Sequence, residues 1–299
     1  MTSERPGPEL SVVVASVNGM PYLARCLDAL EQRAPEAEII VADWTDEPTR
    51  ALLRQRWPQV QLLSYGVPMA VPELRAAGIA EARAPYVAVI EDHCVVQPGW
   101  SEAVLRAHRA GHSVVGGEIV NVVTGRVRDW AAFYCEYSEH MDPLEPGPTP
   151  SLPGMNVSYD RAALASMAPL LAEGRWETWL HPHLGREGFT FHVEPGMVLG
   201  HDKDFGFREF ASQRWHYARS HAGIRNPELG PRRLVYAAGS PLIVPLMLKR
   251  IVRNVRSKPR HGRRFAQALP LILVYLGVWA AGEAAGYALG GGRSLLKVR

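Results

Sequence analysis

The chain has 299 residues, of which 47% are hydrophobic and 21% charged, so it can bury a sizeable core in one large or two smaller domains. Its formal net charge is only +3, and we therefore expect no nucleic-acid partner. Three widely spaced cysteines, Cys26, Cys94 and Cys135, exclude a disulfide framework and a zinc knuckle and favour a reducing compartment. No signal peptide is expected, because Met1–Glu9 is polar and the apolar run at Val12–Ala15 is too short.

The first ninety residues alternate short apolar runs with stretches of helical periodicity. Strands are expected at Leu10–Ala15, Glu38–Ala42, Val60–Leu63 and Tyr86–Ile90. Helices are expected at Met20–Arg33, Thr49–Trp57 and Val71–Ala84. This alternation predicts βαβ units, an α/β fold and a mostly parallel central sheet flanked by helices.

The middle of the chain continues with further helices and extended segments. Further helices are expected at Gly99–Ala110, Arg161–Leu171, Arg175–Leu184 and Phe207–His221. Extended segments are expected at Ser113–Val123 and Phe189–Val198. Inside the first of these, Gly116-Gly117 indicates a bulge or a close backbone approach. The proline-rich segment Asp142–Pro153 is expected to be a loop.

The most informative segment follows the fourth strand. The apolar run Tyr86–Ile90 leads directly into Glu91, Asp92 and His93. These side chains emerge where an open parallel sheet places its ligands, outside the carboxyl ends of the strands. Acidic and imidazole groups so close together suit a divalent cation, since burying them unpaired would be costly. The alternative is a strand end followed by a solvated acidic turn.

The C-terminal part changes character. Leu234–Leu248 is apolar but short, and Phe265–Leu289 has 25 residues with Glu283 as its only charge, enough to cross a bilayer or lie within its interface. Residues 249–264 hold eight lysines and arginines and no acid. Such a run stays on the cytoplasmic side and attracts anionic lipid, so we expect membrane association there. The alternative is a pair of core helices joined by a solvated basic loop.

Five short motifs together carry a family resemblance over roughly residues 10–222. They are Ala15–Gly19 after the first strand, Asp43 after the second, Arg75-Ala76-Ala77-Gly78, the Glu-Asp-His triplet, and Gly154-Met155-Asn156-Val157-Ser158. In these motifs the chain resembles a family 2 glycosyltransferase, an inverting class with a nucleotide-diphospho-sugar-binding (GT-A) fold. The resemblance implies that the first loop cups the nucleotide, that Asp43 contacts its base or ribose, and that Arg75 pairs with the diphosphate.

The triplet most resembles the Asp-x-His motif of the mucin-type N-acetylgalactosaminyltransferases, a retaining class from which only the metal geometry is taken. By that resemblance Glu91 and His93 bind Mn²⁺ or Mg²⁺, with Asp92 beside them on the donor. The imidazole favours Mn²⁺. His201, at the end of Val198–His201, matches a histidine that reaches the metal or the diphosphate in related enzymes.

The acceptor side is implied by the same resemblance. Asn156 would hydrogen-bond the sugar or the acceptor. Glu177 takes the place of the catalytic aspartate and would remove the proton from the acceptor hydroxyl. Its neighbours Trp176 and Trp179 would desolvate it and stack on sugar rings. On a later helix, Arg214 or Arg219 would contact the diphosphate through a planar donor fork.

Other classes fit less well. A dinucleotide-binding dehydrogenase needs Gly-x-Gly-x-x-Gly after the first strand, and the loop there has only Gly19. The non-enzyme alternative is a membrane scaffold or partner protein that has lost catalysis. It is favoured by four departures from the family pattern, namely Trp44, Ala76, His93 and Thr178.

We therefore predict a glycosyltransferase domain over residues 1–225 and a membrane-associating helical segment over residues 226–299. The enzyme would move a sugar from a nucleotide-diphospho-sugar, with a UDP-sugar favoured, to a hydroxyl of a glycan or lipid-linked acceptor. It would use a divalent metal and act at the cytoplasmic face of the cell membrane, in cell-envelope polysaccharide synthesis.

Overall fold

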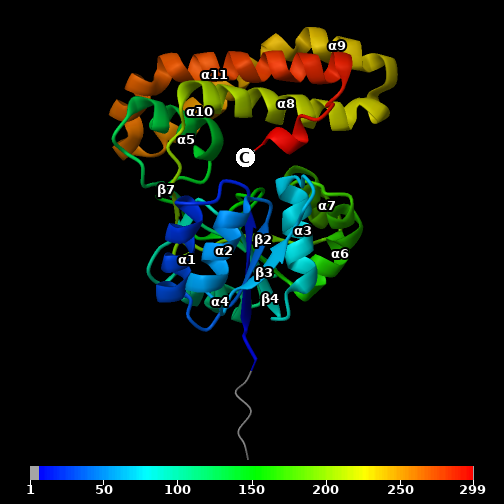
Figure 1. Cartoon of the computed structure of the whole chain (residues 1–299). Coiled ribbons are helices and arrows are strands. Elements are labelled where there is room, and N and C mark those ends of the chain that lie inside the picture. The colour runs from blue at the N-terminus through cyan, green and yellow to red at the C-terminus, as the bar shows by residue number, and fades with distance from the viewer. Residues whose placement is uncertain (1–6, 299) are drawn as a thin grey trace, which may run out of the picture. The chain divides into compact units, whose positions relative to one another are not determined.

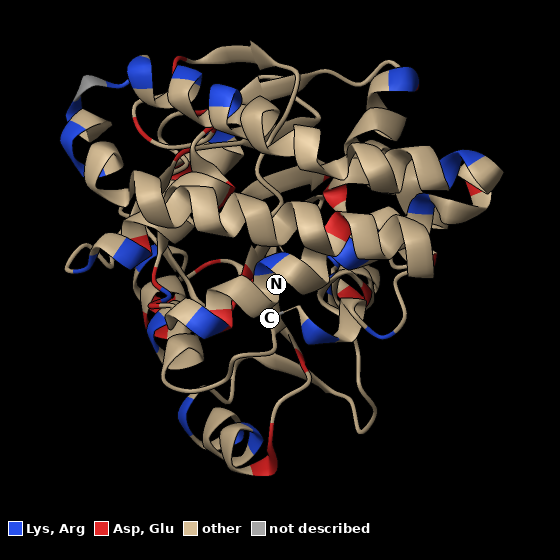
Figure 2. Ribbon diagram, turned by 90° about the horizontal axis from the view of Figure 1, so that it is seen from above, with Lys and Arg blue, Asp and Glu red and all other residues tan. Residues whose placement is uncertain are grey.

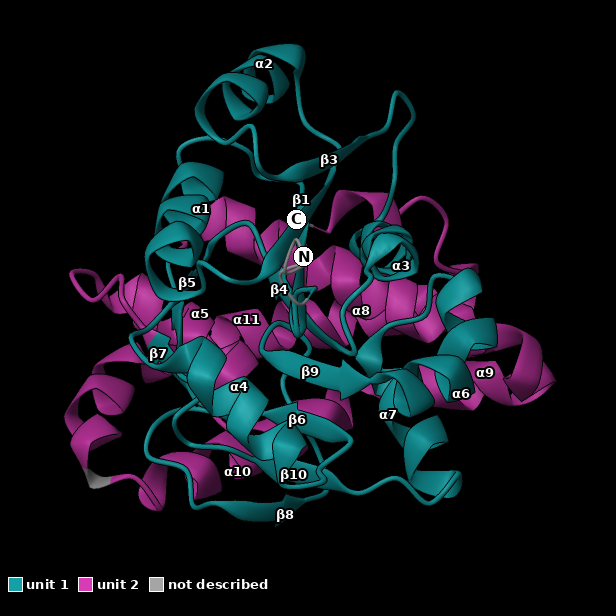
Figure 3. Ribbon diagram, turned by 90° about the horizontal axis from the view of Figure 1, so that it is seen from below, with its two compact units in different colours: residues 1–120, 140–202 teal, residues 121–139, 203–299 magenta. Residues whose placement is uncertain are grey.

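The computed structural model describes residues 7–298, apart from the side chain of Pro259 (Figure 1). Most of Met1–Glu9, where no signal peptide is expected, therefore lies outside the described residues. The chain divides into two compact units, shown in different colours in Figure 3. Unit 1 comprises residues 1–120 and 140–202, and unit 2 comprises residues 121–139 and 203–299. This division differs from the expected boundary near residue 225. Two helices, α5 (Val127–Tyr137) and α8 (Phe207–Leu229), pack on α11 (Gly262–Leu289) and so belong to unit 2.

Unit 1 is built on a mixed sheet of eight strands in the order β3-β2-β1-β4-β9-β6-β10-β8. These strands are β1 (Leu10–Ser16), β2 (Glu38–Asp43), β3 (Gln61–Ser64), β4 (Tyr86–Glu91), β6 (Val114–Gly116), β8 (Gly147–Thr149), β9 (Val157–Asp160) and β10 (Phe191–Val193). The first four strands of the chain pair in parallel, as the alternating pattern predicts, whereas β9 runs antiparallel to both β4 and β6.

The register of the parallel strands gathers polar residues at one edge of the sheet. Ser16 of β1 lies opposite Asp43 of β2, and Ala15 of β1 lies opposite Glu91 of β4. The β-branched run Val12–Val14 is fully buried in the centre of the sheet. The acidic side chains that follow the strands therefore emerge at the same edge, which is where an α/β sheet binds its ligands.

The helices of unit 1 cover both faces of this sheet. They are α1 (Tyr22–Arg33), α2 (Glu47–Arg56), α3 (Val71–Glu81), α4 (Trp100–Arg109), α6 (Arg161–Ala172) and α7 (Glu177–Arg186). In Figure 3, α1 and α4 lie on one side of the sheet and α3, α6 and α7 on the other. Local capping fixes two helix starts: Asp46 accepts from the amide of Thr49 (3.0 Å), and Asp160 accepts from the amide of Ala163 (2.8 Å).

A second, three-stranded sheet has the order β5-β11-β7 and is made of β5 (Cys94–Val96), β11 (Leu199–His201) and β7 (Ile119–Asn121). The predicted strand over Ser113–Val123 is split into β6 and β7 at Gly117. A Cβ at Gly117 would meet the carbonyl oxygen of Met197 at 2.1 Å, which confirms the predicted close backbone approach.

Unit 2 is helical. Besides α5, α8 and α11 it contains α9 (Arg233–Gly239) and α10 (Ile243–Arg256), linked by short 3₁₀ turns. Glycines let α8 and α11 approach closely, since a Cβ at Gly282 or Gly286 would meet a backbone oxygen of α8 at 2.5 Å. Two helical segments, Phe207–Arg256 and Gly262–Leu289, are long and apolar enough to cross a membrane. That finding rests on length and composition, and core helices of soluble proteins meet the same criterion.

Candidate active site

Asp92 organises the loop after β1. Its Oδ2 accepts from the backbone amides of Val17 (2.9 Å), Asn18 (2.6 Å) and Gly19 (3.1 Å), and its Oδ1 accepts from the Asn18 side-chain amide (2.7 Å). Gly19 has a φ of 68°, a backbone conformation that favours glycine. Asp92 is fully buried, and its oxygens hold the loop expected to cup the nucleotide.

Asp92 also orients His93. Burial alone would raise the pKa of Asp92, but hydrogen bonding and charge from His93, with the hydrogen bonds from Asn18, outweigh it and hold the pKa below its usual value. His93 Nδ1 lies 3.4 Å from Asp92 Oδ1, and His93 Nε2 lies 3.5 Å from Glu91 Oε2. A proton on Nδ1 shared with the carboxylate leaves the lone pair of Nε2 facing Glu91. This is how a carboxylate prepares a histidine to bind a metal.

His201 stands next to His93 because of the small sheet. In that sheet His201 pairs with Cys94 in the antiparallel β5–β11 register, and the amide of Asp202 donates to the carbonyl of His93 (2.9 Å). The two imidazole rings meet edge to face with centroids 5.0 Å apart. The three side chains expected to bind metal, from positions 91, 93 and 201, are thus brought together.

Among residues 7–298 no group of three or more histidine, cysteine, aspartate or glutamate side chains is already arranged to hold a metal ion. The donor set nevertheless fits one. A carboxylate oxygen and an imidazole nitrogen face each other at 3.5 Å, and a second imidazole lies beside them. Such mixed oxygen and nitrogen donors suit a divalent first-row metal.

A buried arginine links this cluster to the expected base. The guanidinium of Arg75, on α3, makes ion pairs with Glu91 through Nη2 and with Glu177 through Nη1. Burial would lower the pKa of Arg75, but the two carboxylates outweigh it and raise that pKa. The ring of Trp176 lies 5.4 Å from the guanidinium carbon. Arg75 is therefore placed between two acids, rather than on the surface of its helix.

Glu177 is the first residue of α7, where the helix dipole favours a negative charge. Its carboxylate lies over Gly154, since a Cβ at Gly154 would meet Glu177 Oε2 at 2.6 Å. Two buried groups sense these charges. Burial and the charge of Glu177 raise the pKa of Tyr159, although the charge of Arg75 opposes them. Burial and the charge of Arg75 lower the pKa of His181 to about 4. The Tyr159 hydroxyl and His181 Nε2 are hydrogen-bonded at 2.9 Å, so the groups buried near Arg75 and Glu177 include two neutral side chains.

Asp43 lies at the end of β2, as expected, but it is fully buried. It accepts from the Thr45 amide (3.1 Å) and hydroxyl (2.8 Å) and forms an ion pair with Arg50 (2.9 Å). In this structure its oxygens hold the turn that follows β2. A direct contact with a base or ribose would require these partners to move.

Asn156 requires a correction. It is fully buried, and its side-chain oxygen accepts from the indole of Trp100 (2.9 Å). Its side-chain nitrogen donates to the carbonyls of Glu118 (3.0 Å) and Met197 (2.8 Å). All the polar atoms of the amide are engaged inside the fold, so the residue joins strands instead of facing an acceptor.

The remaining expected residues, Trp179 and Arg214, have partners of their own. Trp179 is half-buried on α7, with the guanidinium of Arg175 6.0 Å from its ring. Arg214 belongs to unit 2, where it lies 4.0 Å from the ring of Trp279 and 3.9 Å from a carboxylate oxygen of Glu136. The contacts of Arg214 thus lie within unit 2.

Two residues of the cluster were not singled out beforehand. Asn18 donates both its backbone and side-chain amides to Asp92, and Gly154 makes room for Glu177. The sequence contains a signal for Asn18, because Asn18 and Gly19 in the loop after the first strand form an Asn-Gly pair, which marks a tight turn. For Gly154 the sequence contains no signal beyond its place in the Gly-x-Asn motif.

Together these contacts define a class of protein. Unit 1 is a sheet of GT-A type, with a carboxylate–imidazole cluster and a second paired carboxylate at its ligand-binding edge. The family model described as "Glycosyl transferase family 2" matches residues 11–167. The chain belongs to that family and is a glycosyltransferase.

A solved structure agrees with the fold. A mannosyltransferase, PcManGT from Pyrobaculum calidifontis, solved with GDP-Man and Mn²⁺, superposes with a TM-score of 0.56 at 16% identity, covering 93% of this chain and 87% of that one. TarS from S. aureus gives a TM-score of 0.49 at 13% identity, covering 93% of this chain and 55% of that one. No curated protein sequence matches the chain.

Proposed function

We propose that the enzyme transfers a sugar from a nucleoside diphosphate donor to an acceptor hydroxyl in one inverting displacement. The observation that carries the proposal is the single cluster formed by Glu91, His93 and Glu177 around Arg75. It joins a candidate metal site, which would stabilise the leaving diphosphate, to a candidate base for the acceptor hydroxyl, and an inverting transfer uses both functions. Glu177 would accept the proton of the attacking hydroxyl as that hydroxyl reaches the anomeric carbon.

Arg75 has a part in this proposal that follows from its two ion pairs. In the structure its guanidinium holds one carboxylate oxygen of each glutamate, so Glu177 is engaged before a donor binds. The diphosphate of a donor offers the guanidinium two further oxygens in the geometry it prefers. Donor binding would draw Arg75 toward the diphosphate and release Glu177 for proton transfer.

A divalent cation would be held by Glu91, His93 and His201, with Asp92 fixing the orientation of His93. When bound, it would neutralise the charge that develops on the leaving diphosphate. The neighbouring structure that contains Mn²⁺ supports such a metal here, as does the imidazole content of the site.

The nucleotide base is left open. The UDP donor favoured by the family resemblance gains no support from the comparisons, since PcManGT was solved with GDP-Man. We therefore propose a nucleoside diphosphate sugar whose base is to be decided by binding.

Thermal unfolding with UDP, GDP and dTDP, each with and without Mn²⁺, tests donor and metal together. A ligand that binds only the folded state raises the unfolding temperature by mass action, so one nucleotide should give a shift that depends on Mn²⁺. Equal unfolding temperatures under all conditions would contradict the proposal. The anomeric configuration of the product, read by NMR, then tests inversion: a retained configuration would exclude the single displacement.

The acceptor and location are proposed from unit 2. Its two long apolar helical segments and the basic run at residues 249–264 support association with the cytoplasmic face of the cell membrane. An acceptor held at that surface, either lipid-linked or a growing envelope glycan, would be within the enzyme's reach. Cell fractionation tests this: the chain should sediment with membranes, and recovery in the soluble fraction at low salt would contradict it.

A further inference from the structure

The helical unit has an outer surface that its own fold does not cover. Its exposed large apolar side chains lie along α9, the following turn, α10 and α11, and they are Leu234, Val235, Tyr236, Leu242, Leu246, Leu273, Val274 and Leu289. Between Glu228 and Glu283 the chain has ten lysines and arginines and no acid. In Figure 2 the long helices of this unit are tan over most of their length, and the basic residues are gathered in a few places along them. We call this the basic–apolar surface.

Along α10 the two characters share one face. Leu242 and Leu246 are exposed just before and within the first turns, and Lys249, Arg253 and Arg256 continue the same face at helical spacing. The opposite face, with Ile251 and Val255, is buried. A helix with a buried face and an outer face that is apolar at one end and basic at the other suits the boundary between lipid headgroups and acyl chains.

The helix lengths favour lying in that boundary over crossing the bilayer. A crossing helix needs about 20 apolar residues. The segment Phe207–Arg256 meets that length as a whole, but a 3₁₀ turn divides its apolar part into α9 and α10, which have 7 and 14 residues. Helix α11 has 28 residues, but it is packed at Gly282 and Gly286 against α8, which carries Arg214, Arg219 and Arg225. Taking the pair through hydrocarbon would bury these charges at a high cost.

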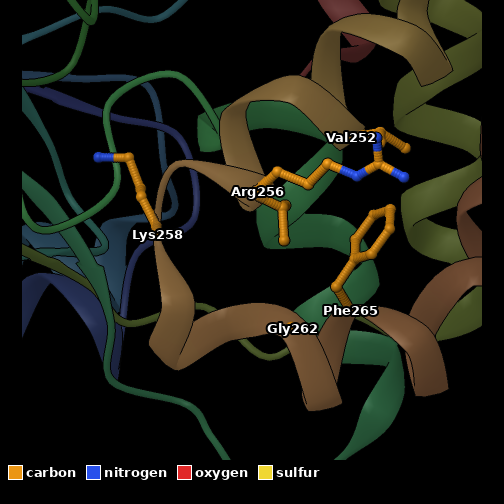
Figure 4. A pocket seen from close by; sticks show the side chains of 6 residues that line it. Val252, Arg256, Lys258, Gly262 and Phe265 are labelled. Carbon is orange, nitrogen blue, oxygen red and sulfur yellow. The ribbon is translucent and has the colours of Figure 1, made fainter.

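A cavity of about 410 Å³ opens where α10 ends and α11 begins. It is lined by Val252, Val255, Arg256, Lys258, Gly262 and Phe265. Figure 4 shows the side chain of Arg256 reaching out above the ring of Phe265, whereas Lys258 points in the opposite direction. The lining is largely apolar and bears one arginine, and the volume lies within the range of about 300–1,000 Å³ typical of small-ligand sites.

The aromatic residues beside the cavity fit the same setting. The ring of Tyr134, on α5, lies 5.6 Å from that of Phe265, and Trp130 lies 5.8 Å from the ring of His261 in the turn before α11. Tyr134 is fully buried and supports the wall of the cavity, whereas Trp130 is half-buried, as suits a tryptophan at the level of lipid headgroups. Arg256 and the ring of Phe265 therefore border an apolar hollow that is backed by further aromatic rings.

We propose that this cavity binds one acyl chain of an anionic phospholipid, with the phosphate held by Arg256, and that the basic–apolar surface lies in the plane of the membrane around it. The inference deepens the membrane location proposed above but does not depend on sugar transfer. Charge decides the occupant: Glu139 pairs with Arg250, but no acid lies between Glu228 and Glu283 to pair with the other basic side chains, and these match a lipid with an anionic head and an apolar tail.

Photo-crosslinking of the full chain on vesicles tests the site. The vesicles contain phosphatidylcholine with about one third phosphatidylglycerol, and the acyl chain of the phosphatidylglycerol carries a diazirine. Mass spectrometry should find adducts within residues 252–265. The same diazirine chain on phosphatidylcholine should give fewer, and added inorganic phosphate should leave the adducts unchanged. Adducts confined to other segments, or competition by inorganic phosphate as strong as that by lipid, would overturn the proposal.

Two variants sharpen the result. Val252→Trp fills the cavity, so adducts within residues 252–265 should fall severalfold while the protein still floats with vesicles. Arg256→Ala leaves a folded surface position and should lower the preference for phosphatidylglycerol about fivefold. Arg54→Ala, an exposed arginine of α2 in unit 1, is the charge-matched control and should change nothing.

The outcomes separate this inference from the enzymatic one. No flotation on anionic vesicles would overturn the lipid site and leave the basic–apolar surface to an acidic protein. Lipid adducts at the cavity in a chain that binds no nucleotide would instead reject the proposed transfer and keep the lipid site.

Discussion

Two pairs of acidic residues in unit 1 differ in their burial and in their hydrogen-bond partners. Asp43 and Asp92 are fully buried, and their oxygens are taken by backbone amides, hydroxyls and an arginine of the adjoining loops. Glu91 and Glu177 keep partial exposure and share one guanidinium. The short side chains thus build the loops of the site, and the longer ones reach into it.

The difference teaches which acids can react. A carboxylate that accepts several backbone hydrogen bonds is held ionised and rigid, and it cannot exchange partners without unmaking a loop. A carboxylate paired only with an arginine can exchange that partner for a metal or a substrate proton. The following predictions test this contrast, from the largest expected effect to the smallest.

Asp92→Ala should cost about 3–5 kcal/mol of unfolding free energy, because three backbone amides and the Asn18 side chain lose their acceptor inside the protein. Denaturant unfolding measures the loss. Glu91→Ala should cost less than about 2 kcal/mol, since Arg75 keeps Glu177 as a partner. Equal losses would remove the distinction between the two kinds of acid.

Glu91→Gln should weaken nucleotide binding in the presence of Mn²⁺ by about tenfold or more and leave the metal-free affinity unchanged, because an amide is a poor ligand for the cation. Isothermal titration with and without Mn²⁺ measures both affinities. Glu102→Gln, an exposed acid of α4, is the control. An undiminished effect of Mn²⁺ in Glu91→Gln would remove this residue from the metal site.

His108, outside the cluster, is a titratable group that is buried and hydrogen-bonded in the same way as Asp43 and Asp92. Burial lowers its pKa to about 4, and it is hydrogen-bonded to His112 O (2.7 Å) and Ser158 (2.8 Å). Because the folded pKa lies below the unfolded value near 6.5, the stabilisation is complete above that pH and is lost as pH falls toward 4. Between pH 7 and pH 5 the free energy of unfolding of the unaltered chain should therefore fall by about 2 kcal/mol more than that of His108→Gln, measured by denaturant unfolding. Parallel stability profiles for the two proteins would refute this.

Gly154→Ala should slow transfer about tenfold with little change in stability, because the new Cβ would lie 2.6 Å from Glu177 Oε2 and push the carboxylate from its position. Turnover at saturating donor is the measurement. Gly185→Ala, on α7 with open space at its Cβ position, is the matched control. Unchanged turnover in Gly154→Ala would mean that the position of Glu177 does not limit the reaction.

Much of the fold was predictable from the sequence, because its strands are buried runs such as Val12–Val14 and Val87–Ile90 that end in polar residues. The three-residue strand β5 was not expected, because Cys94–Val96 has no period of its own and is defined by its pairing with β11. That pairing is what brings His201 to His93. Helix α5 was missed as well, and it is needed to understand why unit 2 begins where it does.

The candidate site was predictable in its residue types and less so in their roles. That Glu91 and His93 lie at the ligand-binding edge follows from strand ends meeting at one edge of a sheet, whereas Glu177 comes from the start of α7 and joins them through Arg75. The partners of Asn156 and Arg75 depend on side chains 56 and 102 positions away along the chain, which no local pattern reveals. A buried polar residue takes its role from whichever partner completes its hydrogen bonds.

The most direct test of the central claim compares Glu177→Gln with Glu173→Gln, an exposed acid paired with Arg175 just before α7. Turnover and donor affinity are measured together for each. Loss of the base should lower turnover of Glu177→Gln by a factor of about 10²–10⁴ with donor affinity largely intact, while Glu173→Gln behaves as the unaltered enzyme. Loss of donor binding together with turnover, or transfer at the normal rate, would contradict the assignment of Glu177 as the base.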